Sequence, residues 1–223
     1  MWRGERPRPG LIRIAALSEQ LLSFRTQEKE GTVDSVAMLQ RSVDQTLGLV
    51  GRIGPRQLGD RTPCAEWDVR AVINHVTGGA TMFAISAEEG TVADDVLARL
   101  MGGDNLGDDY KGALGTASAR AMAAFDDPGV LSKMVKLPFG EMPAGVALQI
   151  AVFDLTTHAA DLAWATGQSV TDAELLDAAL ALGRQMIGPD LRRPGVFDDE
   201  QPVLDGASAA DRLLAFAGRK VDR

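Results

Sequence analysis

Apolar residues return along most of this chain at the spacing of an α-helix. From Ser35 onward they recur at steps of three and four residues, until Gly54-Pro55 ends the pattern. These positions are Val36, Leu39, Val43, Leu47 and Val50. Such steps place the apolar side chains on one face of a helix. The pattern therefore predicts a first amphipathic helix with one side turned to a core.

The same reading predicts a series of further helices. A second long helix is expected to begin at Glu66-Trp67-Asp68, and two more should run over 111–125 and 144–165. A fifth should extend from a cap at Thr171 or Asp172 to Ile187. Shorter helices are expected over 92–101 and 209–217, and any sheet should be confined to 130–140. Gly78-Gly79 lowers helix propensity but allows another backbone to approach closely. Together these elements predict an all-α protein, an antiparallel four-helix bundle with extra C-terminal helices.

The first 34 residues differ from the rest. They open with the stretch MWRGERPRPG and close on the charged run RTQEKEG, with one amphipathic segment, LIRIAALSEQLLSF, between them. We expect residues 1–34 to be a loosely attached or disordered extension and residues 35–223 to form the bundle domain. Met38 stands where a compact helical domain would naturally begin, so the start of translation stays open.

Composition and charge narrow the class of partner. A net charge of −8 argues against binding to nucleic acid or to an anionic membrane surface. No run of eighteen apolar residues is present, so no transmembrane helix is expected. The single cysteine, Cys64, excludes an intrachain disulfide and favours the cytoplasm. We therefore expect small-molecule partners, with a homodimer left open.

The two histidines of the chain both fall inside expected helices. His158 follows Asp154 by four residues, which puts both side chains on one helical face with apolar neighbours. A carboxylate that faces a core needs a charge partner or a cation. With His75 from another helix, this pair can converge on one divalent ion. An ordinary buried ion pair and a core histidine with one hydrogen bond stay open as alternatives.

Other polar or aromatic residues are weaker candidates. Asp161 can orient the His158 ring from outside a metal site, although an ordinary N–H partner or an exposed carboxylate is at least as good a reading. Cys64 is either a soft ligand or a small buried thiol. Trp67 and Trp164 are most simply packing residues. The chain has no Gly-rich phosphate loop, no G-x-S-x-G elbow and no CxxC pair.

Several segments together resemble one known family. Thr62-Pro63-Cys64-Ala65-Glu66-Trp67-Asp68-Val69, followed by Asn74-His75-Val76, resembles the T-P-C-x-x-W-x-V…N-H signature of mycothiol-dependent maleylpyruvate isomerase-like, DinB-related metal-binding proteins. The stretch from Asp154 to Gln168 is similar to the family motif D/E-x-x-x-H-x-W-D-L-A-x-A-T-G, and residues 138–144 and 211–216 also fit. The resemblance spans about residues 36–219 and implies a DinB-like bundle with His75, Asp154 and His158 as metal ligands. Ala160 departs from the motif, which has Trp there, and Trp164 is the candidate replacement.

Two imidazoles and one carboxylate leave a coordination position open, as in a catalytic zinc site. Zinc is the default ion, and Fe2+ or Ni2+ suits the same ligands. The resemblance implies a zinc-dependent, mycothiol-type thiol transferase or isomerase that acts on a small electrophile, with mycothiol as cosubstrate. The alternative is a non-catalytic metal-binding protein of stress response or regulation, and a plain helical interaction domain comes third. The resemblance implies that isomerases of this kind commonly carry a C-terminal domain that contributes to the substrate pocket, often with an arginine near the metal. Only about 50 residues follow the motif helix here, too few for such a domain, although they include Arg184, Arg192 and Arg193. Maleylpyruvate itself is therefore not the expected substrate.

Overall fold

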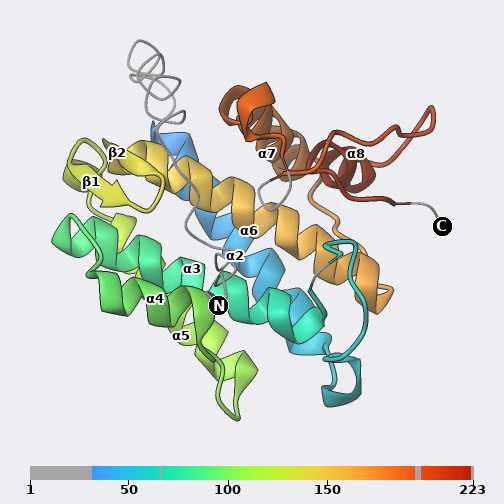
Figure 1. Cartoon of the computed structure of the whole chain (residues 1–223), viewed down its shortest axis with the longest axis horizontal. Coiled ribbons are helices and arrows are strands. Elements are labelled where there is room, and N and C mark those ends of the chain that lie inside the picture. The colour runs from blue at the N-terminus through green and yellow to red at the C-terminus, as the bar shows by residue number, and fades with distance from the viewer. Residues whose placement is uncertain (1–31, 66, 194–196, 222–223) are drawn as a thin grey trace, which may run out of the picture.

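Four long helices form the bundle. The structure, a computed structural model, describes residues 32–65, 67–193 and 197–221. The bundle helices are α2 (Thr32–Arg52), α3 (Val69–Glu89), α5 (Tyr110–Phe125) and α6 (Ala144–Thr166). Helices α2 and α3 each pack against both α5 and α6, which gives the cyclic order α2–α5–α3–α6 (Figure 1). The all-α, DinB-like antiparallel bundle that the sequence predicts is confirmed.

The beginnings of the helices follow from their capping residues. Asp68 has an extended backbone and its carboxylate accepts a hydrogen bond from the amide of Ala71, so it is the N-cap of α3. The expected start of this helix at Glu66 is therefore wrong, because Trp67 and Asp68 belong to the preceding turn. Asp172 caps α7 (Ala173–Met186) in the same way, through the amide of Leu175.

Shorter elements surround the bundle. Helix α4 (Asp94–Gly102) packs against α3. Helices α7 and α8 (Ala209–Phe216) pack against α6, on the side of the bundle away from α4 (Figure 1). Strands β1 (Met134–Leu137) and β2 (Gly140–Pro143) form an antiparallel hairpin that ends three residues beyond the predicted limit at 140. Three single 3-10 turns complete the described elements, η2 (Pro55–Gln57), η3 (Pro128–Val130) and η4 (Pro189–Leu191).

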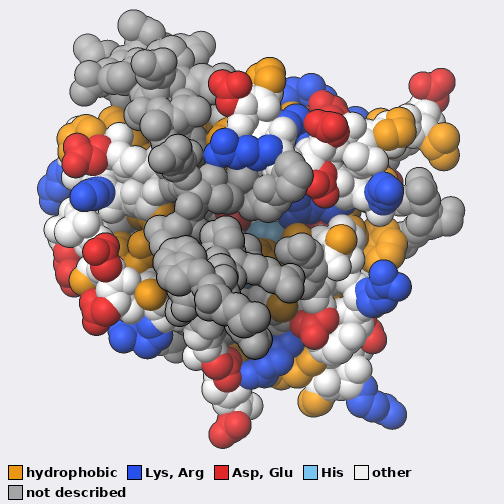
Figure 2. Space-filling model, viewed as in Figure 1, with side chains coloured by type: hydrophobic (Ala, Val, Ile, Leu, Met, Phe, Trp, Pro, Cys, Tyr) orange, Lys and Arg blue, Asp and Glu red, His pale blue; other side chains and the backbone are white. Residues whose placement is uncertain are grey.

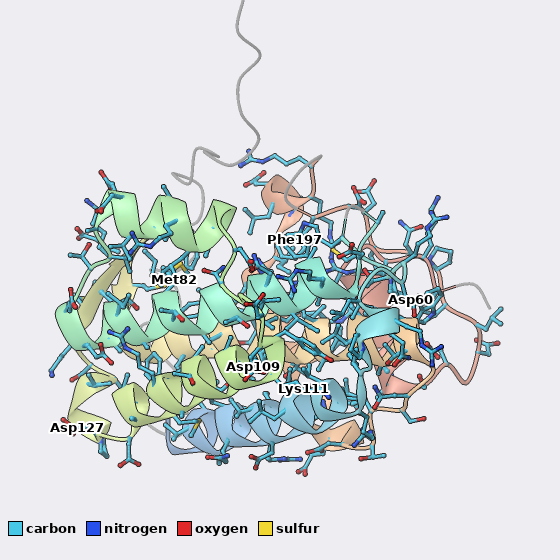
Figure 3. The ribbon with its side chains drawn as sticks, turned by 90° about the horizontal axis from the view of Figure 1, so that it is seen from below. Asp60, Met82, Asp109, Lys111, Asp127 and Phe197 are labelled. Atoms are coloured by element: carbon cyan, nitrogen blue, oxygen red, sulfur yellow. The ribbon has the colours of Figure 1, made fainter. Side chains whose placement is uncertain are left out.

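The ends of the helices are tied to one another by hydrogen bonds. Lys111 at the start of α5 donates to the carbonyl of Gly51 near the end of α2, at 2.8 Å. Figure 3 shows Asp109 and Lys111 at the start of α5, while Asp127 lies beyond its opposite end. This contact joins the end of α2 to the start of α5, as expected for neighbouring helices that run antiparallel.

Helix α6 lies at the centre of the packing. It contacts α2, α3, α7, α8 and the hairpin, and residues are buried on nearly all of its sides. Gly167 ends it in the left-handed conformation, with φ of 68°, which favours glycine. Among the described helices, none combines the length and the apolar character that crossing a membrane requires.

The N-terminal prediction falls mostly outside the described residues. Helix α2 begins at Thr32, within the predicted extension of residues 1–34. The amphipathic segment LIRIAALSEQLLSF lies before residue 32, so its expected helix and loose attachment stay predictions.

Candidate metal centre

Two helices bring the candidate ligands together. His75 lies in the second turn of α3, and Asp154 and His158 lie one turn apart on α6. The Nε2 atoms of His75 and His158 are 3.2 and 3.6 Å from the same Asp154 oxygen, Oδ1. One ligand atom from each of the three residues lies within 4.8 Å of the other two. The structure thus assembles the three residues that the sequence singles out.

The burial of the cluster is uneven. The side chain of His158 is 7% exposed, whereas those of His75 and Asp154 are 28% and 30% exposed. In Figure 2 a small pale-blue histidine surface is visible near the middle of the displayed face. One side of the cluster therefore reaches the surface, while the His158 side is enclosed.

The charges of the cluster support one another. Burial works to raise the pKa of Asp154, but the adjacent His75 and His158 outweigh this effect and lower that pKa to about 2. Burial works to lower the pKa of His75, but the Asp154 carboxylate outweighs it and the pKa is raised. Asp154 is therefore a carboxylate at neutral pH and attracts positive charge.

Asp161 fixes the orientation of His158. Its carboxylate is fully buried, and Oδ2 lies 2.9 Å from Nδ1 of His158. When Nδ1 donates a proton to this carboxylate, the lone pair of the neutral ring lies on Nε2, the atom that faces Asp154. The sequence leaves Asp161 open between this role, an ordinary N–H partner and exposure. In the structure Asp161 is not exposed, and it contacts both His158 and an N–H donor of Arg219.

The indole ring of Trp67 packs against both imidazoles. The Trp67 ring centroid is 4.5 Å from that of His75 and 5.4 Å from that of His158, with both pairs tilted. Sequence reasoning treated Trp67 as a packing residue and so missed this position. The signal was its place in the loop before α3, inside the motif that also contains Cys64.

The remaining candidates lie elsewhere. Cys64 is not one of the clustered ligand residues, and its sulfur lies 3.6 Å from Nη2 of Arg219. Arg184 pairs with Glu200, and both Arg184 and Arg192 lie over the Phe216 ring. The arginine beside the centre is Arg219, which follows α8 and carries no motif. It forms an ion pair with Asp161 at 3.3 Å.

Comparison with known proteins identifies the family of the chain. The chain matches the family described as "Mycothiol maleylpyruvate isomerase N-terminal domain" over residues 39–163. Uncharacterized proteins from two strains of Mycobacterium tuberculosis are each 38% identical over 194 residues, which is 85% of this chain and 100% of theirs.

Solved structures match more distantly. The crystal structure of the mycothiol-dependent maleylpyruvate isomerase has a TM-score of 0.57 and 16% identity. The match covers 68% of this chain and 67% of that one, and a mutant of the same isomerase matches at 15% identity. At this level of identity the likeness shows the fold.

Proposed function

Since this chain belongs to the family of the mycothiol maleylpyruvate isomerase N-terminal domain, we propose that His75, Asp154 and His158 hold one divalent metal ion. The function that we infer from this site is a thiol transfer or isomerisation on a small electrophile. The observation that carries the proposal is the convergence of one ligand atom from each residue within 4.8 Å.

The donor set of the described residues fits such an ion. Ligands about 2.0–2.2 Å from one zinc ion lie roughly 3–4 Å from each other. The observed separations of 3.2 and 3.6 Å from Asp154 Oδ1 fall in that range. Asp154 carries its negative charge at neutral pH, and the Asp161 contact leaves Nε2 of His158 as the ligand atom. Zinc is our first assignment, and Fe2+ or Ni2+ suits the same nitrogen and oxygen donors.

Three protein ligands leave a further coordination position for a small molecule. When bound, a divalent ion here lowers the pKa of a thiol in that position, so that a nucleophile is available near neutral pH. The chain's own residues prepare the position. Asp161 holds the His158 ring, and the Trp67 ring lies against both imidazoles. We assign no separate catalytic acid or base.

The family name points to mycothiol as the thiol cosubstrate. A thiolate that adds to an electrophilic C=C bond breaks its π bond and leaves the electron pair on the neighbouring carbon. Uptake of a proton from solvent at that carbon gives a stable thioether, which is S-transfer, whereas rotation about the new single bond and expulsion of the thiolate give the isomer. Both outcomes use the same centre, so we leave the choice between them to the assay.

The experiment incubates zinc-loaded protein with mycothiol and other low-molecular-weight thiols, together with a panel of electrophiles that includes maleylpyruvate. Thiol consumption is followed for the wild type, for His158→Ala and for the control Asp177→Ala. Asp177 is an exposed partner of Arg212 on the outer side of α7.

We expect His158→Ala to lose both zinc and turnover, because two remaining ligands hold zinc poorly, whereas Asp177→Ala should match the wild type. Failure of the wild type to bind a divalent metal would refute the proposal. Stoichiometric zinc without turnover across the whole panel would favour a non-catalytic metal-binding protein of stress response or regulation.

A further inference from the structure

The guanidinium of Arg219 is held by three separate parts of the fold. Its Nε and Nη2 lie 3.4 and 3.3 Å from the two oxygens of Asp161 on α6. Nη1 donates to the carbonyl of Ala217 at 2.7 Å, and Nη2 also lies 3.6 Å from the Cys64 sulfur. The side chain is only 12% exposed. The C-terminal segment after α8 is thereby joined to α6 and to the loop before α3.

The Asp161 carboxylate connects this arginine to the candidate centre. Oδ2 of Asp161 lies between Nδ1 of His158, at 2.9 Å, and Nη2 of Arg219, at 3.3 Å. Oδ1 faces Nε of the same guanidinium. Asp161 itself has no exposed surface, and a buried carboxylate without a cation is strongly disfavoured. Arg219 therefore supplies the cation beside this buried carboxylate and fixes how the carboxylate is turned.

From these contacts we propose that Arg219 is a positioning residue of the metal centre, one that acts on His158 through Asp161. The inference rests on the proposed metal site. It adds that the C-terminal segment completes that site, since the planar fork of Arg219 fixes the plane of the carboxylate that orients the histidine. The guanidinium is committed to protein groups in three directions, which separates this role from that of a cation that binds substrate.

A positioning role and a purely electrostatic role of Arg219 predict opposite changes in metal affinity when the arginine is removed. Arg219 cancels the charge of Asp161, so the net negative charge of the centre is that of Asp154. Removal of the arginine charge would make the surroundings of the ion more negative and should tighten the binding of a dication. If Arg219 instead holds Asp161 and His158 in place, its removal should weaken that binding. The sign of the change therefore decides between the two roles.

The test measures Zn2+ affinity in the full chain by competition with a chromophoric chelator. We expect Arg219→Met to weaken zinc binding by about tenfold or more, the range found when groups that orient metal ligands are removed. Arg219→Lys should also weaken it, because a single ammonium keeps the charge but cannot form the fork. This variant carries the test if Arg219→Met does not fold. The matched control is Arg212→Met, which removes an exposed arginine of α8 that pairs with Asp177, and it should bind zinc as the wild type does.

Two further measurements separate positioning from a general loss of structure. If Arg219 acts through Asp161, adding Arg219→Met to Asp161→Asn should weaken zinc binding no further. In the metal-free protein, ring 15N shifts at a pH where both imidazoles are neutral should show His158 with its proton on Nδ1. Arg219→Met should shift that tautomer toward a mixture. The chain has two histidines, so the assignment is direct.

Equal or tighter zinc binding by folded Arg219→Met, or wild-type affinity in Arg219→Lys, would overturn the inference while leaving the metal site intact. Absence of zinc binding by the wild type would instead refute the proposed function. The tautomer measurement still reports on Arg219 in that case, because it needs no metal.

Discussion

Two adjacent glycines in the middle of α3 should respond to alanine substitution with opposite signs. In the interior of a helix, glycine is less favourable than alanine by about 0.8–1.0 kcal/mol. At Gly79 an added Cβ would meet Asp154 Oδ2 at 3.8 Å, an ordinary contact distance. Gly79→Ala should therefore raise the free energy of unfolding by about 0.5–1 kcal/mol.

The surroundings of Gly78 are much tighter. An added Cβ there would lie 2.5 Å from the carbonyl oxygen of Leu100 and 2.7 Å from Nδ2 of Asn105. The amide of Asn105 donates to that same Leu100 carbonyl at 2.8 Å, so the methyl group would push apart the hydrogen bond that ends α4. Overpacking of this kind costs about 1–3 kcal/mol, and a weakened hydrogen bond about 0.5–1.5 kcal/mol more. After the gain in helix propensity, Gly78→Ala should lower stability by about 1–3 kcal/mol.

The assay is thermal unfolding of the metal-free protein followed by circular dichroism. For a chain of this size about 1 kcal/mol corresponds to roughly 2–4 °C in Tm. Gly79→Ala should raise Tm by a few degrees, and Gly78→Ala should lower it by roughly 2–12 °C. A rise in Tm for Gly78→Ala would show that α4 does not approach α3 as closely as the structure has it.

Three further predictions concern the centre itself. Asp161→Asn should retain zinc but bind it about 10–100-fold more weakly, and wild-type affinity in the chelator assay would remove Asp161 from its assigned role. Zinc at about 100 times its Kd should stabilise the wild type by about 2.7 kcal/mol, seen as a rise of roughly 5–10 °C in Tm that is absent in His158→Ala. In the metal-free protein the pKa of Asp154 is about 2 in the folded state and about 3.9 in the unfolded state. Its contribution to the free energy of unfolding is therefore full above about pH 4 and is lost as the pH falls toward 2. The sign is opposite for His75: its raised pKa adds stability at low pH, and this stability is lost as the pH rises through the pKa of the folded state. The dependence of unfolding on pH, measured for Asp154→Asn, should show neither effect.

The residues that α6 contributes to the centre can be predicted from their spacing in the sequence. Asp154, His158 and Asp161 stand at positions i, i+4 and i+7 of one helix, so helical geometry alone puts them on one face. The apolar period of the chain likewise gave the helices and their order. His75 was a candidate because the chain has only one other histidine, and the family motif then connected the two helices.

Contacts between distant parts of the chain could not be read in this way. Arg219 reaches Asp161 across 58 residues, and nothing in the spacing of the C-terminal segment marks it among the other arginines. From the sequence alone, Trp67 is most simply a packing residue, because its contacts with both imidazoles depend on how the loop before α3 folds. The misplaced start of α3 has a local cause. Asp68 is a good N-cap residue, but together with Glu66 it also fits the acidic first turn of a helix that begins earlier.

The distribution of exposure in the cluster bears on what kind of site it is. His158 and Asp161 form its enclosed side, where a buried carboxylate fixes one imidazole and Arg219 fixes that carboxylate. His75 and Asp154 form the outer side, where each side chain keeps more than a quarter of its surface. A closed structural zinc site surrounds its ion with four protein ligands, whereas a catalytic site keeps one position free. The three proposed ligands, with an enclosed inner side and a partly exposed outer side, fit the second arrangement. The outer side, with His75 and Asp154, is therefore the side on which solvent reaches the cluster.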